Sequence, residues 1–287
     1  MTTIGILWPG AMGSALGRVW GEGGVRVVTT VAGRSDRTRE LAGDLTLLGS
    51  VDEVVTASDA VVSIVPPARA VDQAHEIADA ATRTGHRPVV ADLNAISPVT
   101  MTEVNDILTA AGCPVVDGAV SGPPPGPTTD SVLFLSGPDC TPFADLVAPG
   151  LTAKVVGDQV GGASATKMST AAIYKGTKAL LLQSLLTANH HGVLDAVVED
   201  LRIGIPELTA DLAKDLAVAI AKSDRFPAEM EEIAATQAAA GLGSHLYAAI
   251  GEVYRRAYAE SPRRTPEAAA HVHDLGDVLA WHESIVD

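Results

Sequence analysis

The chain has 287 residues and a formal net charge of −15, from 20 Lys and Arg against 35 Asp and Glu. At about 150 residues per domain, this length predicts one large domain or two modest ones. Apolar residues make up 47% of the sequence and aromatic residues only 3%, so aliphatic side chains must fill a real core and intrinsic disorder is not expected. The acidic balance argues against a nucleic acid or an anionic membrane as partner, because both bind basic surfaces.

The cysteine content and the N-terminus bound the location of the protein. Cys113 and Cys140 are too few for a disulfide framework and lack the spacing of a metal site, so no metal is expected. No segment approaches the ~18 apolar residues that would span a bilayer. No basic region precedes the first apolar run, so a signal peptide is not predicted. We expect a soluble, cytoplasmic protein.

Short apolar runs alternate with helical stretches in the first half of the chain. The expected strands are Ile4–Leu7, Val25–Ala32, Ala60–Val65 and Pro88–Ala91, and the expected helices are Ala11–Trp20, Arg37–Ala42, Ala70–Ala81 and Pro98–Ala111, with a turn at Val54–Ser58. Such alternation predicts βαβ units and a parallel sheet. The continuous apolar strands predict that both faces of this sheet are covered.

The pattern changes after these units. Val115–Asp117 and Val132–Leu135 are expected strands that flank a proline-rich loop at Gly122–Pro127. Consecutive prolines cannot donate ladder hydrogen bonds, so the loop is predicted to be rigid, either as a wall that faces a substrate or as a plain connector. Beyond it, Ala163–His191 reads as one long helix, and the remainder is helical with breaks near 204–206, 225–227, 241–243 and 261–266.

The first expected turn has the context of a dinucleotide-binding loop, since it follows a strand and opens a helix. Its candidate cofactor contacts are Pro9, Gly10, Ala11, Met12 and Gly13. Gly10 would let the backbone approach a pyrophosphate, and Gly13 would permit close packing of helix on sheet. Trp8 stands where the first glycine of the pattern is usual, and it must take an ordinary β conformation or shift the loop. A purely structural turn is the alternative.

The end of the second strand favours one form of the cofactor. Arg34, Ser35 and Arg37 offer two guanidinium groups and a hydroxyl, which suit a 2′-phosphate. NADP(H) is therefore preferred over NAD(H), although Asp36 could bind a ribose hydroxyl and the segment could be a solvated basic loop.

Lys167 is the candidate general acid/base. At 100° per residue it shares one helix face with Ala171, Tyr174 and Lys178, a polar stripe on an otherwise apolar helix. Such groups suit a cleft in which a lysine donates a proton to a carbonyl oxygen. The alternative is that the lysines extend to solvent.

Five segments, in order, resemble the β-hydroxyacid dehydrogenases, the superfamily that includes 6-phosphogluconate dehydrogenase. They are Ile4–Gly13, Ser63–Pro67, Asp92–Pro98, Asp117–Gly122 and Gly161–Lys167. The resemblance implies that Ser121 and Gly122, with Pro123, bind the substrate, and that Lys167 is the general acid/base. It also implies that Val65, Pro66, Pro67 and Asn94 lie beside the nicotinamide ribose, with Asn94 reaching the substrate as well.

One departure concerns the turn after the lysine. The family usually carries an asparagine there, whereas this chain has Thr170 and Ala171. Tyr174, Lys175 or Lys178 is the expected replacement, with Tyr174 as a second catalytic candidate and Lys178 as a substrate ligand. The second half is similar to one branch of the superfamily, which has a short helical C-terminal domain of uncharacterised function; the similar stretches are Gly122–Pro124, Lys167–Ser169, Tyr174–Leu181 and Glu229–Ala234.

Together these observations predict an α/β protein with a Rossmann-type, mostly parallel sheet domain over residues 1–160 and an all-α substrate and dimerisation domain over 161–287. The expected function is an NADPH-dependent oxidoreductase that acts on a small, anionic hydroxy or oxo substrate. An imine reductase and a non-catalytic NADPH-binding regulatory protein are the alternatives. The apolar C-terminal helices exceed what a small domain can bury, so a homodimer is expected.

Overall fold

The computed structural model describes residues 2–261 and 264–281. The chain divides into two compact units, one up to Met168 and the other from Ser169 onward, whereas the sequence predicted a boundary near residue 160. None of the described helices is long and apolar enough to cross a membrane.

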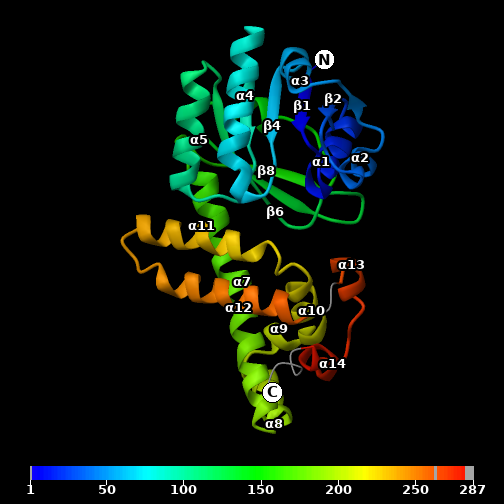
Figure 1. Cartoon of the computed structure of the whole chain (residues 1–287), viewed down its shortest axis with the longest axis vertical. Coiled ribbons are helices and arrows are strands. Elements are labelled where there is room, and N and C mark those ends of the chain that lie inside the picture. The colour runs from blue at the N-terminus through cyan, green and yellow to red at the C-terminus, as the bar shows by residue number, and fades with distance from the viewer. Residues whose placement is uncertain (1, 262–263, 282–287) are drawn as a thin grey trace. The chain divides into compact units, whose positions relative to one another are not determined.

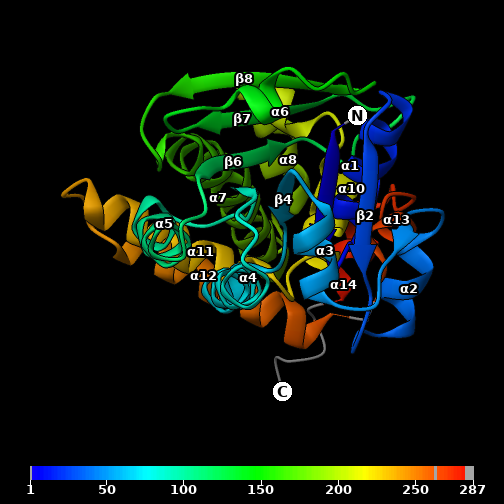
Figure 2. The ribbon, with the colours of Figure 1, turned by 90° about the horizontal axis from the view of Figure 1, so that it is seen from above.

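The N-terminal unit contains one sheet, which has eight strands among the described residues (Figures 1 and 2). Its order is β3-β2-β1-β4-β5-β6-β7-β8. The strands are β1 (Thr3–Leu7), β2 (Arg26–Thr30), β3 (Thr46–Leu47), β4 (Ala60–Ser63), β5 (Val89–Asp92), β6 (Val115–Ser121), β7 (Ser131–Ser136) and β8 (Leu151–Gly157). All pairs are parallel except β6 with β7, so the first six strands end at one edge of the sheet. This edge carries the candidate site.

Helices supply an apolar layer on each side of the sheet. They are α1 (Ala11–Glu22), α2 (Asp36–Ala42), α3 (Val51–Ala57), the 3-10 turn η1 (Pro67–Arg69), α4 (Ala70–Thr84), α5 (Pro98–Ala110) and α6 (Thr141–Ala144). Neighbouring residues of each strand enter opposite cores: Leu7 packs in the cluster with α3, α4 and α5, and Ile6 in the cluster with α1. The predicted mostly parallel sheet, followed by a helical region, is confirmed.

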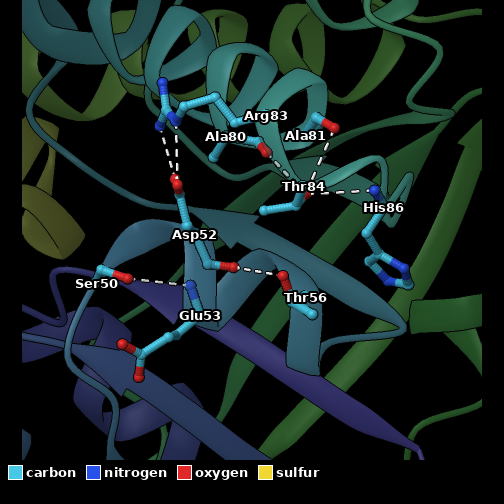
Figure 3. Close-up of polar contacts among 9 residues, drawn as sticks. All are labelled: Ser50, Asp52, Glu53, Thr56, Ala80, Ala81, Arg83, Thr84 and His86. Atoms are coloured by element: carbon cyan, nitrogen blue, oxygen red, sulfur yellow. Dashed lines mark hydrogen bonds and ion pairs between the residues drawn. The ribbon is translucent and has the colours of Figure 1, made fainter.

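The prediction of a turn at Val54–Ser58 is wrong, because α3 occupies most of it. Ser50 caps this helix: its hydroxyl accepts a hydrogen bond from the Glu53 amide at 3.2 Å (Figure 3). Arg83 of α4 donates two hydrogen bonds to the Asp52 carboxylate, at 2.7 and 3.0 Å. A helix of 7 residues is marginal alone, so the cap and the contact with α4 account for a helix that local pattern did not reveal.

Two strands were not predicted. β3 has only two residues, both exposed, which leaves no hydrophobic pattern to detect. β3 and β8 are the two outermost strands of the sheet, and β8 is also largely exposed. Strands with little burial carry a weak period-2 signal, because that signal reports the face that packs on a core.

The C-terminal unit is helical. The long predicted helix is confirmed as α7 (Gly162–His190), and it is followed by α8 (Leu194–Gly204), α9 (Pro206–Thr209), α10 (Leu212–Ala221), α11 (Phe226–Ala239), α12 (His245–Glu260), α13 (Pro266–Ala269) and α14 (Leu275–Ala280). Helices α11 and α12 lie side by side (Figure 1). The breaks near 204–206, 225–227 and 241–243 are confirmed, and residues 262–263 of the fourth lie outside the described residues. Further helix ends, at 210–211 and 270–274, were not predicted.

Candidate functional site

Trp8 begins the loop between β1 and α1 in a left-handed backbone conformation, with φ of +54°. The expectation that Trp8 would take an ordinary β conformation is therefore wrong, and the alternative of a shifted loop stays a prediction. The residue keeps the conformation that a glycine would normally supply there, although such a φ costs a bulky side chain on the order of 1 kcal/mol or more. Its ring packs against the apolar cluster that contains Leu7 and Ala70.

The two glycines of this loop are required for different reasons. A side chain at Gly13 would meet Ile64 at 3.0 Å and Ile6 at 3.4 Å, so Gly13 allows α1 to approach the sheet. A side chain at Gly10 would meet no protein atom within 4 Å, and its φ of −77° is open to any residue. Neither packing nor conformation explains Gly10. The uncapped start of α1 next to Gly10 leaves backbone amides open to an anion, which is compatible with the predicted pyrophosphate contact.

The three polar residues predicted for a 2′-phosphate follow β2 but differ in environment. The guanidinium of Arg34 lies over the Trp8 ring, 3.6 Å from its centroid, and burial lowers the pKa of this group below its usual value. The Ser35 hydroxyl caps α2 by accepting from the Thr38 amide at 3.4 Å. Arg37 is exposed. Arg34 and Ser35 are thus both held by specific contacts, and the hydroxyl of Ser35 is engaged at the start of α2.

A second guanidinium at this edge was missed by the sequence reasoning. Arg69 follows Pro66 and Pro67 after β4, and it pairs with Asp72 at 3.3 Å and with Glu76 at 3.9 Å. Burial raises the pKa of Glu76, while Arg34 and Arg69 both act to lower it, so the three charges interact. The signal was present in the sequence as an arginine four residues beyond the expected strand end, two residues after the second proline.

Asn94 lies at the ends of β4 and β5 and is 1% exposed. Its side-chain amide donates to the Ser63 hydroxyl at 2.9 Å and to Asp92 at 2.6 Å, and its oxygen accepts from the Val65 amide at 2.6 Å. The predicted contact of Asn94 with a ligand stays a prediction, although little of its side chain is exposed. Asn94 also fixes the segment Val65–Pro67, which is partly exposed at the edge of the sheet.

The buried carboxyl group of Asp92 makes the stability of the protein depend on pH. This carboxyl is fully buried, and the loss of solvation raises its pKa to about 7, although hydrogen bonds from Asn94 and Ser63 oppose the shift. Because the folded protein holds this proton more tightly than the unfolded chain, stability should fall as pH rises from about 4 to about 7.

We therefore expect the free energy of unfolding of the wild type to drop by roughly 2–4 kcal/mol more over this pH range than that of Asp92→Asn. Urea unfolding at several pH values measures the difference, and Asp130→Asn, at an exposed position, is the matched control. Equal pH slopes for wild type and Asp92→Asn would contradict the raised pKa.

The predicted substrate segment lies at the end of β6. Ser121 is partly exposed and Pro123 is exposed, while Gly122 has φ of +123° and a side chain there would meet Ser131 Oγ at 2.5 Å. The Ser131 hydroxyl donates to the Pro123 carbonyl, and the Thr129 hydroxyl donates to the Pro124 carbonyl at 2.9 Å. These bonds tie the proline loop to the segment that begins β7, and the predicted rigidity of the loop stays a prediction; the Ser121 hydroxyl lies at the carboxyl end of β6.

Lys167 lies in the second turn of α7, within the N-terminal unit. Its Nζ donates a hydrogen bond to the Val120 carbonyl at 2.8 Å, so the ammonium is next to Ser121 and Gly122. The predicted acid/base and the predicted substrate anchor are thereby brought together at the carboxyl end of β6.

A buried carboxylate holds the start of α7, and its structural role was not anticipated. Asp117 of β6 is fully buried and accepts hydrogen bonds from the Gly161 amide at 2.9 Å, the Ser164 amide at 3.0 Å and the Ser164 hydroxyl at 2.7 Å. The Ser136 hydroxyl donates to the same carboxylate at 2.9 Å and accepts from the Ala163 amide. A negative charge at a helix N-terminus is favourable, and here it fixes the turn that precedes Lys167.

The residues expected to replace the family asparagine belong to the C-terminal unit. Lys175 forms an ion pair with Glu229, with both side chains largely buried, and its Nζ lies 5.0 Å from the centroid of the Phe226 ring. Lys178 pairs with Asp215 at 3.4 Å, and Tyr174 is 66% exposed. Lys175 is therefore engaged in the core of its own unit, which leaves Tyr174 and Lys178 as the more accessible candidates.

The sequence of the N-terminal unit matches the model of the NAD-binding domain of 6-phosphogluconate dehydrogenase over residues 3–149, about half of the chain. The chain belongs to this family. The match confirms the family resemblance and contains four of the five segments on which it was based; the fifth, Gly161–Lys167, lies beyond the matched residues. Residues 188–257 match a domain of unknown function, DUF1932. This match agrees with the predicted branch of the superfamily, but it does not indicate an activity.

Two relatives at 27–28% identity match most of the chain. An uncharacterized 28.5 kDa protein of Methanothermus fervidus is 28% identical over 217 residues, 75% of this chain and 82% of that protein. The solved structure of conserved protein MTH1747, of unknown function and described as similar to 3-hydroxyacid dehydrogenases, is 27% identical with a TM-score of 0.67, covering 89% of this chain and 97% of that one.

Two further solved structures share the fold at lower identity. The 3-hydroxyisobutyrate dehydrogenase of Mycobacterium tuberculosis has a TM-score of 0.67 at 18% identity, covering 94% of this chain and 98% of that one. An imine reductase variant from Myxococcus stipitatus, in complex with NAD+, has a TM-score of 0.56 at 20% identity, covering 97% and 98%. The fold is thus shared by hydroxyacid dehydrogenases and imine reductases.

Proposed function

We propose that the protein is an NADPH-dependent oxidoreductase that interconverts a small hydroxy acid and its oxo form. The observation that carries the proposal is the position of Lys167, whose Nζ lies 2.8 Å from the Val120 carbonyl beside Ser121 on an NAD-binding domain. The proposed domains are residues 1–160 for the cofactor and 161–287 for substrate and dimerisation. Buried cysteines without a disulfide suit the proposed cytoplasmic location.

The cofactor would be held by the loop from Pro9 to Gly13, where the backbone at Gly10 is open to close approach. Arg34, with Ser35 and Arg37, would take a 2′-phosphate, and Val65–Pro67 would flank the nicotinamide end. When bound, the nicotinamide supplies or accepts a hydride. The rest of the chemistry is the handling of charge and protons by the protein.

In this reaction Lys167 Nζ would give a proton to the substrate oxygen in reduction and take it back in oxidation. The hydrogen bond to the Val120 carbonyl orients the ammonium, and Asp117 fixes the helix turn that carries it. Ser121 and the Gly122 amide would bind the substrate carboxylate. Holding the reacting groups in place can contribute ~7–11 kcal/mol to catalysis.

An assay of NADPH and NADH oxidation over panels of oxo acids and of imines tests the proposal. Turnover of an oxo acid with NADPH is the expected result. Turnover of imines alone would identify an imine reductase, whose fold the chain shares. Tight NADPH binding without turnover of either panel would instead identify a regulatory protein.

We also propose that the protein is a homodimer through its C-terminal helices. Within the C-terminal unit, α7 and α12 line an apolar groove of about 910 Å³, and Leu180 and Leu246 beside it are 60% and 57% exposed. A second copy would cover this apolar surface. Sedimentation velocity should show a dimer that Leu180→Arg shifts toward monomer, while a wild type that sediments only as a monomer would contradict the proposal.

A further inference from the structure

Trp8 combines a strained backbone with a contact to a charged group. It holds a left-handed φ of +54°, which the described residues show at no other non-glycine position. A glycine would adopt this conformation without strain, so the indole offsets the cost through its contacts. The ring packs against the apolar cluster that contains Leu7, and the guanidinium of Arg34 lies 3.6 Å from the ring centroid.

Stacking on Trp8 positions Arg34 without using the N–H donors of its guanidinium, which an ion pair would use. In the described part of the chain, no carboxylate lies within ion-pair distance of Arg34, and the nearby Glu76 pairs with Arg69 instead. An aromatic ring binds one face of a guanidinium and leaves its N–H edge available, whereas a carboxylate would occupy that edge. Arg34 therefore keeps the donors that a phosphate binds in bidentate fashion.

The neighbouring face of α4 contains polar groups that lack partners. Gln73 is 1% exposed, and neither its side-chain nitrogen nor its oxygen has a hydrogen-bond partner among the described residues. One carboxylate oxygen of Glu76, seven residues beyond Arg69, is also buried without a partner. Buried polar groups without protein partners cost about 1–3 kcal/mol each, so bound water is the expected partner of these atoms.

We propose that Trp8 is the positioning residue for recognition of an adenosine 2′-phosphate: it holds the Arg34 guanidinium flat, so that the free N–H edge of Arg34 binds the phosphate. The proposal rests on the proposed binding of NADP(H) and adds the residue that sets the preference for it over NAD(H). A glycine at position 8 would relieve the backbone but release Arg34. The strained tryptophan is thus the source of cofactor selectivity in this chain.

The test is calorimetric binding of two half-molecule probes, adenosine 2′,5′-bisphosphate and 5′-AMP, to the full chain. The ratio of their dissociation constants isolates the 2′-phosphate. The wild type should prefer the bisphosphate by at least about tenfold, and Trp8→Gly should lose most of this preference. Trp8→Phe, which keeps an aromatic ring, should restore it to within about threefold of the wild type. Arg39→Ala, an exposed arginine of α2, is the control and should leave it unchanged.

A double-mutant cycle separates positioning from a general effect on the fold. Arg34→Ala should abolish the preference, and Trp8→Gly should remove nothing further in that background. Additive losses, or an unchanged preference in Trp8→Gly, would overturn the inference, and so would a wild type that binds both probes equally. If the wild type binds neither NADPH nor NADH, the proposed function itself fails, which is a distinct result.

Discussion

Replacing Lys167 by alanine is expected to lower kcat about 100-fold to 10,000-fold, while the dissociation constant for NADPH stays within about threefold of the wild type. The reason is the position of Nζ beside Ser121, held by the Val120 carbonyl at 2.8 Å. A proton donor at this place acts on the reacting oxygen and not on the cofactor. Steady-state rates with the best oxo acid of the panel, together with calorimetric NADPH binding, measure the two effects.

The matched control is Lys154→Ala, which removes an exposed lysine from β8 of the same unit. This variant should keep its rate. Lys167→Arg retains a positive charge but cannot release a proton near neutral pH, so it should be nearly as slow as the alanine variant. A loss of rate in alanine but not in arginine would assign Lys167 to charge stabilisation alone, and a Lys167→Ala enzyme with more than a tenth of normal activity would refute the proposed role.

Much of this sheet edge could be predicted from sequence because its signals are local. The strand at Ile4, the glycines at 10 and 13 and the start of α1 lie within ten residues of one another. The breaks in the helical half are likewise set by Gly and Pro close in sequence, and their positions were predicted correctly near 204–206 and 241–243. Local backbone chemistry is sufficient for such features.

The features that were missed depend on partners distant in the chain. The stack of Arg34 on Trp8 joins the ends of two strands, and α3 depends on Arg83 of α4. The left-handed φ of Trp8 was not predicted because its residue type opposes it, although the position is that of the first glycine of the loop pattern. The hydrogen bonds that hold Val65 through Asn94 likewise follow only from the packing of β4 against β5.

The alanine variant of Asp117 should destabilise the protein by roughly 3–4 kcal/mol. This change removes an acceptor for four hydrogen bonds, two of them from amides at the start of α7, and leaves buried donors without a partner. Urea unfolding followed by tryptophan fluorescence measures the loss. A Trp281→Phe background confines the signal to Trp8 and Trp20, which both belong to the N-terminal unit.

Asp117→Asn separates stability from position at this site. The amide can keep the bonds to one carboxylate oxygen and donate to the Ser164 hydroxyl, so it should cost only about 1–2 kcal/mol. Since the start of α7 carries Lys167, we expect kcat to fall in this variant while NADPH affinity is kept. Asp130→Ala, at an exposed aspartate, should change neither quantity. If Asp117→Ala unfolds within 1 kcal/mol of the wild type, the carboxylate does not anchor the helix, and the turn that presents Lys167 must be held by the Ser136 cap.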